Sequence, residues 1–137
     1  MKIPSSFLLL LSVSLIATTS FAQNIQTSTI EWNCISTFTS QPGTVVDENT
    51  KVVSSAEQII WYDDNGAALK TLSITGSTGS WSNVSNNGSI IFNITSGDDT
   101  GIAQFSKSDG VTRIRIHIVI DEDSPVFELK VGTLNVQ

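Results

Sequence analysis

The stretch Val111-Thr-Arg-Ile-Arg-Ile-His-Ile-Val-Ile120 decides the fold class, because apolar and polar side chains alternate along it. The even positions from 114 to 120 are all isoleucine, whereas three odd positions carry Arg113, Arg115 and His117. Successive side chains of a strand point to opposite faces of the sheet. The pattern therefore predicts an antiparallel strand with one face in the core and the other face in water.

Residues 126–131 repeat this division and are expected to pair with the isoleucine strand. Setting the two apolar faces together places His117 opposite Glu128 or Lys130, depending on the register. The remaining expected strands are residues 29–37, 57–62, 67–75, 80–84, 89–94 and 101–107.

Two regions between these strands decide the connections. Residues 44–54 hold either one bent strand or two short strands separated by Asp47-Glu48-Asn49. Asn65-Gly66 predicts a tight hairpin turn, and Gly110 is expected to take the left-handed position of a bulged three-residue turn. The prediction is an all-β, single-domain antiparallel β-sandwich or barrel of about eight or nine short strands with hairpin connections, with a slight preference for a sandwich-like barrel.

The first residues have the pattern of an export signal. A basic Lys2 precedes an apolar run from Phe7 to Ile16, and small residues stand before Gln23. The run is about half of the ~20 apolar residues that cross a bilayer, so no transmembrane anchor is expected. We predict a cleaved signal peptide at residues 1–22, a single all-β domain at residues 23–137, and a secreted or periplasmic location.

Charge and cysteine content limit the partners. The chain has seven basic and thirteen acidic residues, and Lys2 is the only charged residue of the leader, so residues 23–137 carry a net charge of −7. Binding to nucleic acid needs clustered basic residues and is not expected. The single cysteine, Cys34, excludes an intramolecular disulfide, so the core itself must hold the domain together. We expect a monomer.

No residue pattern indicates catalysis. A serine or cysteine nucleophile needs a base, and the one histidine, His117, lies in a regular strand. A pair of Cys34 with His117 is conceivable, but nothing in the spacing favours it. Zinc needs more histidine and cysteine ligands than the chain has. We predict that the protein is not an enzyme and has no cofactor, with calcium as the one alternative.

The calcium alternative rests on acidic loops. In a meander the loops alternate between the two ends of the sheet, so Asp98 and Asp99 should share one end with Asp121 and Asp123. Carboxylate oxygens are the ligands that calcium prefers. The spacing matches no EF-hand loop, and aspartate is common in turns because it caps them, so solvated turns are the favoured interpretation.

The leading functional hypothesis is a non-catalytic domain that binds a small ligand or a glycan through aromatic side chains. The candidate binding residues are Trp61, Tyr62, Trp81, Arg113 and Arg115, the arginines belonging to a basic patch on the outer face of the last hairpin. The alternative is a structural or protein-interaction module without a small ligand, and a calcium-stabilised domain is the third possibility. Three buried tryptophans together with an open edge on the first strand, residues 29–37, would favour protein interaction.

Overall fold

The computed structural model describes residues 24–137, so the predicted signal peptide at residues 1–22 lies outside the described part. The described chain consists of strands and their connections. The nine strands are β1 (Ile30–Thr39), β2 (Thr44–Val46), β3 (Thr50–Ser54), β4 (Gln58–Tyr62), β5 (Ala68–Ser80), β6 (Gly88–Ser96), β7 (Asp99–Ser108), β8 (Val111–Val119) and β9 (Val126–Val136).

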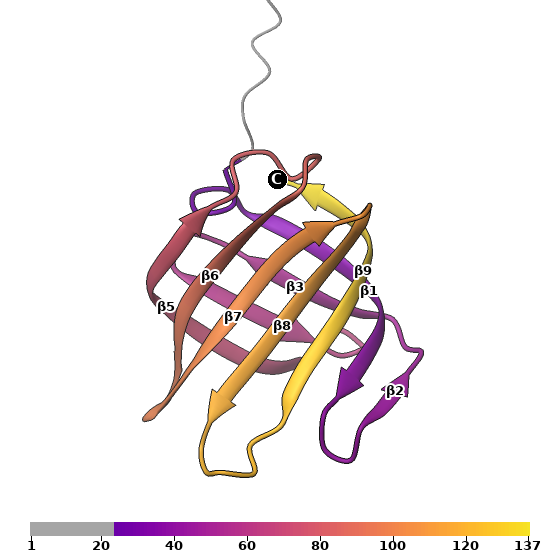
Figure 1. Cartoon of the computed structure of the whole chain (residues 1–137), viewed down its shortest axis with the longest axis vertical. Helices are drawn as coiled ribbons and strands as arrows, with labels where there is room; N and C mark the ends of the chain where they lie inside the picture. Colours follow the sequence, from indigo (N-terminus) through magenta and orange to yellow (C-terminus); the bar gives the residue numbers. More distant parts are fainter. Residues whose placement is uncertain (1–23) are drawn as a thin grey trace, which may run out of the picture.

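Eight of these strands close into an antiparallel barrel (Figure 1). The order is β1-β3-β4-β5-β6-β7-β8-β9, and pairing of β1 with β9 closes the ring. The predicted all-β antiparallel domain is confirmed, and of the two architectures considered the structure has the barrel. Between residues 24 and 137 there is no long apolar helix that could span a membrane.

The first strand has two different partners along one edge. Its first half, Ile30–Cys34, pairs with β3, whereas its last residues, Thr37–Thr39, pair with β2. Residues 47–49 separate β2 from β3 and belong to no strand. Of the two possibilities left open for residues 44–54, the structure therefore has two short strands, and β2 lies outside the closed ring beside the end of β1 (Figure 1).

Two predicted strand boundaries are wrong. Residues 80–84 do not form a strand of their own, because β5 continues to Ser80 and the chain then turns inward at Trp81, whose ring is buried. The strand β9 does not end at Val131 but runs on to Val136, where it pairs with Ile30 at the start of β1. Closing the ring explains this extension, since the last strand must follow the whole length of the first.

The hairpin turns also differ from expectation. At residues 108–111 the turn has two central residues, Asp109 (φ 50°) and Gly110 (φ 76°), both in the left-handed region, as a type I′ turn requires. The turn at Asn65-Gly66 is wider than predicted. Only Gly66 has a positive φ there, and Asp63 closes the loop by accepting backbone hydrogen bonds on its carboxylate.

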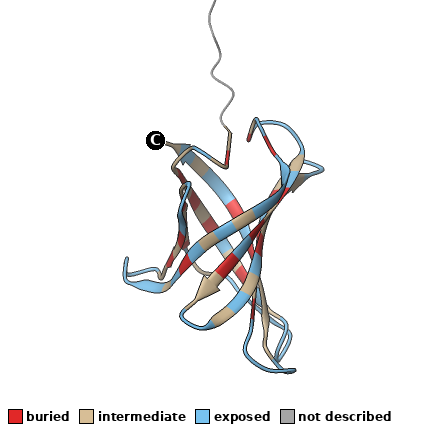
Figure 2. Ribbon diagram, turned by 90° about the vertical axis from the view of Figure 1, so that its left-hand side faces the viewer, coloured by how far each residue is buried: buried red, intermediate tan, exposed pale blue. Residues whose placement is uncertain are grey.

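Side chains fill the barrel interior. Trp32 packs against Phe105 with ring centroids 5.2 Å apart, and Phe92 packs edge-on against the ring of Phe105. Trp61 and Phe127 form a second aromatic pair, at 5.3 Å. Buried residues recur along the strands and alternate with exposed ones (Figure 2), as expected for an eight-stranded barrel whose interior is just wide enough for its own side chains.

Candidate functional site

The tryptophans proposed for ligand binding lie in the core. Trp61 is 5% exposed and Trp81 is 2% exposed, and Trp32 is fully buried. The Trp81 ring covers Gly88, and its Nε1 donates a hydrogen bond to the carbonyl oxygen of Asn86 at 2.9 Å. Neither candidate tryptophan presents an open ring face to solvent.

The other candidate residues point outward from different parts of the barrel. Tyr62 is half-buried on β4, next to the inward-facing Trp61. Arg113 and Arg115 are exposed on β8, which stands four places from β4 in the ring of eight strands. The structure therefore brings Arg113 and Arg115 together but separates them from the aromatic candidates.

The basic patch on β8 and β9 contains its own counter-charge. Arg113 pairs directly with Lys130 across the strands, and Arg115 pairs with Glu128. The Glu128 carboxylate also forms an ion pair with Arg113, with 3.4 Å between Nε and Oε1. An exposed pair of this kind stabilises by about 0.2–1 kcal/mol. The single carboxylate of Glu128 offsets one of the three positive charges of this patch.

The histidine is separated from the cysteine by the barrel wall. His117 lies on the outer face of β8 opposite Val126, so neither predicted neighbour, Glu128 or Lys130, is its cross-strand partner. Cys34 faces the interior from β1 and is 1% exposed. Burial raises the pKa of its thiol to about 12, and the neighbouring Thr50 side chain opposes this shift. The arrangement does not supply a nucleophile with a base.

The acidic loops gather at one end of the barrel, as the meander topology requires. Asp98 lies in the β6–β7 turn and Asp99 is the first residue of β7, and the β8–β9 loop carries Asp121 and Asp123. The Asp121 carboxylate accepts a hydrogen bond from the backbone N–H of Asp123 at 2.9 Å, so it stabilises its own turn. Within residues 24–137, no three His, Cys, Asp or Glu side chains are grouped so that they could hold a metal ion.

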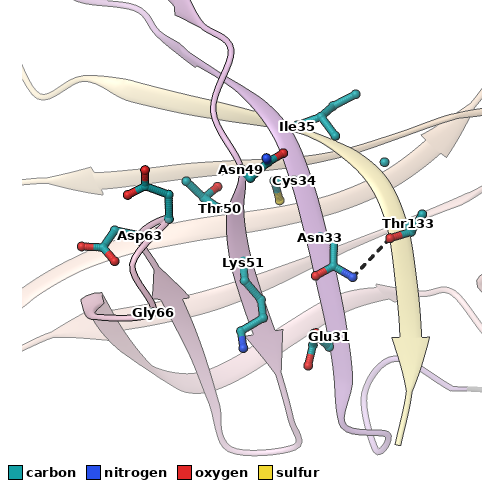
Figure 3. A pocket seen from close by; sticks show the side chains of 12 residues that line it. Glu31, Asn33, Cys34, Ile35, Asn49, Thr50, Lys51, Asp63, Gly66 and Thr133 are labelled. Carbon is teal, nitrogen blue, oxygen red and sulfur yellow. Dashed lines mark hydrogen bonds between the residues drawn. The ribbon is translucent and has the colours of Figure 1, made fainter.

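A polar groove of about 490 Å³ lies on the outer wall where β1, β3 and the β4–β5 turn meet (Figure 3). Its lining includes Glu31 and Asn33 from β1, Lys51 from β3, Asp64 from the turn and Thr133 from β9. The Asn33 Nδ2 donates a hydrogen bond to Thr133 Oγ1 at 3.2 Å. We call this depression the β1–β3 groove.

Sequence reasoning did not single out the β1–β3 groove. Asn33 and Lys51 occupy ordinary outward-facing positions of their strands, and only the cross-strand register places them side by side. The alternation of β1 gives their orientation, but no local motif indicates that the two strands are neighbours.

An apolar patch borders the strand that lies outside the ring. Val45 is 64% exposed and Val46 is 51% exposed, and Phe38 pairs with Val45 across β1 and β2. Ile35 is also exposed on β1. The edge of the first strand is not open, because β1 pairs with β2 and β3 on one side and with β9 on the other. Among the described strands, β2 alone has a single neighbouring strand. Val46 pairs with the buried Thr37 and faces the opposite side from Val45, so the outward apolar pair at this edge is Phe38 and Val45.

Comparison of the chain with models of protein families, with curated proteins and with solved structures found no match, so the geometry described above is what bears on function.

Proposed function

We propose that this chain is an exported, non-catalytic binding domain that recognises a partner protein along the open edge of β2. The observation that carries the proposal is the combination of three buried tryptophans with one open strand edge flanked by exposed valines. An exposed edge offers unpaired backbone N–H and C=O groups to which an extended segment can add as a further strand.

The length of the open edge fits a short segment. The edge begins at Thr44, and residues 47–49, which pair with no described strand, continue it towards β3. In such complexes the backbone hydrogen bonds supply affinity, while alternate side chains supply specificity. Here Val45 shares the outer face with Phe38, so an added strand would place an apolar side chain beside them.

Charge decides which segment fits. Asp47 and Glu48 directly follow β2, and the same end of the barrel carries Asp63 and Asp64 in the β4–β5 turn. A second copy of this chain would bring like charges together at that edge, which is unfavourable. The partner that we propose is therefore an extended segment in which apolar residues alternate with lysine or arginine.

The leading sequence hypothesis is a small ligand or glycan held by Trp61, Tyr62 and Trp81. Tyr62 is half-buried, but the two tryptophan rings would have to leave the core to contact a ligand. A buried aromatic side chain is worth about 3–5 kcal/mol to the fold, so the aromatic site is the less favoured proposal. Calcium stabilisation remains a third proposal, supported only by the shared end of the acidic loops.

The test uses a fluorescent peptide of about seven residues that alternates valine with lysine. Its fluorescence anisotropy should rise in a saturable manner on titration with the protein, whereas a peptide that alternates valine with glutamate should not bind. The double change Asp47→Lys/Glu48→Lys should weaken binding of the lysine peptide about tenfold or more, which corresponds to ~1.4 kcal/mol.

A matched control is Ile102→Ser. Ile102 is 39% exposed and lies on β7, where it pairs with Asn93 of β6 on one side and with His117 of β8 on the other. This variant should bind the lysine peptide like the unchanged protein. Absence of binding by the lysine peptide, or equal binding by the Asp47→Lys/Glu48→Lys variant, would contradict the proposal.

A further inference from the structure

We propose a second, separate site: the β1–β3 groove binds a saccharide that is uncharged or carries an amine. The site does not depend on the β2 edge, because its polar lining comes from the outer faces of β1, β3 and β9 and from the β4–β5 turn. The two proposals can therefore fail independently.

The groove lies where the regular pairing of the barrel is interrupted. The register between β1 and β9 shifts on both sides of Cys34, and the register between β4 and β5 shifts at Trp61/Tyr62. The break between β2 and β3 at residues 47–49 lies in the same wall. Such bulges are over-represented beside functional sites, because they re-aim side chains and interrupt pairing.

One glycine shapes the β9 side of the groove. A Cβ atom on Gly132 would lie 2.7 Å from Cγ2 of Ile35, so the absence of a side chain leaves room for Ile35 to lie across β9. Ile35 is 45% exposed and gives the groove an apolar border. A sugar ring presents C–H groups as well as hydroxyls, and such a border can contact the C–H groups.

The polar groups of the groove keep hydrogen-bonding capacity for a ligand. In residues 24–137 the one ion pair joins Arg113 to Glu128, so Lys51 makes none with Glu31 or Asp64. The Lys51 ammonium instead lies 5.1 Å from the centre of the Tyr62 ring. Carboxylate acceptors and an ammonium donor on one wall match hydroxyl groups, which both donate and accept.

Two of the lining residues direct their polar atoms elsewhere. Thr50 pairs with the inward-facing Cys34 across β1 and β3, so its hydroxyl lies on the inner face beside the Cys34 thiol. Asp63 accepts two backbone hydrogen bonds on Oδ1 and mainly holds its turn. The outward-facing side chains of Glu31, Asn33 and Lys51 are therefore the groups that a ligand can reach.

The charge of the lining selects among saccharides. Glu31, Asp63 and Asp64 bring three carboxylates to the groove, against the single ammonium of Lys51. An acidic sugar would be repelled by this excess of negative charge, whereas a neutral or amino sugar would not. The predicted class therefore excludes uronic acids.

The experiment is a titration of isotope-labelled protein followed by the NMR signals of its backbone amides. The probes are maltotriose, the deacetylated chitosan trisaccharide and trigalacturonate. With the first two, the signals of Asn33, Lys51 and Thr133 should shift in a saturable manner, and trigalacturonate should leave them in place. Asn33→Ala and Lys51→Met should each weaken binding about tenfold, since each removes hydrogen bonds to the ligand.

The matched control is Lys107→Met, because β7 stands four places from β3 in the ring. This variant should bind like the unchanged protein, and the dispersion of the amide signals verifies that each variant is folded. The proposal is overturned if neither maltotriose nor the chitosan trisaccharide shifts the groove signals, if the shifts map elsewhere, or if trigalacturonate binds equally well.

Discussion

Two tryptophans in the barrel differ in one hydrogen bond, and this difference predicts unequal costs for the same substitution. The Trp32 Nε1 donates a hydrogen bond to Ser54 Oγ at 2.9 Å, and both residues are fully buried. The Trp61 Nε1 is also buried but has no partner. Replacing either indole with the phenyl ring of phenylalanine removes the same atoms.

The magnitude follows from the atoms left behind. Trp32→Phe leaves the Ser54 hydroxyl buried without a partner, which costs about 1–3 kcal/mol in addition to the lost ring volume. Trp61→Phe removes an N–H group that already lacks a partner, so it carries no such penalty. We therefore expect Trp32→Phe to lower the free energy of unfolding by about 1–3 kcal/mol more than Trp61→Phe does.

A double-mutant cycle isolates the hydrogen bond. Ser54→Ala alone should cost about 1–3 kcal/mol, because it leaves the Trp32 N–H without a partner. Combined with Trp32→Phe, it should cost less than the sum of the two single changes, with a coupling of about 0.5–3 kcal/mol for contacting residues.

The assay is urea unfolding followed by far-ultraviolet circular dichroism, since the substitutions themselves alter tryptophan fluorescence. Equal costs for Trp32→Phe and Trp61→Phe, or simple additivity of Trp32→Phe with Ser54→Ala, would refute the reasoning.

Three further predictions concern other parts of the barrel. Burial raises the pKa of Cys34 from 9.0 to about 12, so its thiol should not react with a disulfide reagent at pH 8 until the protein unfolds, and rapid labelling of native protein would contradict this. The stability due to the neutral thiol should be complete below pH 9 and be lost as the pH rises towards 12. Gly101→Ala should prevent folding or destabilise the protein severely, because the new Cβ would collide with the backbone carbonyl oxygen of His117. At Gly66 a Cβ would meet no atom, so Gly66→Ala should cost only about 1–2 kcal/mol for the positive φ. Similar melting temperatures for the two variants would be the contrary result. The calcium hypothesis predicts that EDTA lowers the melting temperature, and an unchanged melting curve would remove it.

Local patterns were sufficient to predict the regular half of the barrel. The pairing of β8 with β9 sets Ile114 opposite Leu129 and Ile116 opposite Phe127, as the alternation of apolar residues required. The orientation of His117 was also predictable, but its neighbour was not. His117 lies opposite Val126 and not opposite Glu128 or Lys130. The register of β8 against β9 depends on the length and shape of the β8–β9 loop, which the alternation does not specify.

The candidate site was less predictable, because a residue's surroundings depend on pairings distant in sequence. The Trp61-Tyr62 pair requires one inward and one outward ring, but only the closed ring determines that Trp61 packs on Phe127 from β9. Likewise, Asn33 meets Thr133 through the pairing that closes the barrel. No periodicity in a single sequence identifies such a contact.

The distribution of irregularities connects the fold with both proposals. From β6 to β8 the register is unbroken, and Ile90, Phe92 and Phe105 there provide fully buried packing. In a closed ring every backbone edge is satisfied, so that half offers a partner only side chains. The wall made by β1, β3 and β4, together with the adjoining β2, contains the strand break, the strand with a single neighbour, and the register shifts of β1–β9 and β4–β5, whereas one further shift lies between β5 and β6. Unpaired backbone groups and re-aimed side chains are what a partner can use, so both proposed binding sites lie on this side of the barrel. The regular half supplies the stability that an irregular wall needs.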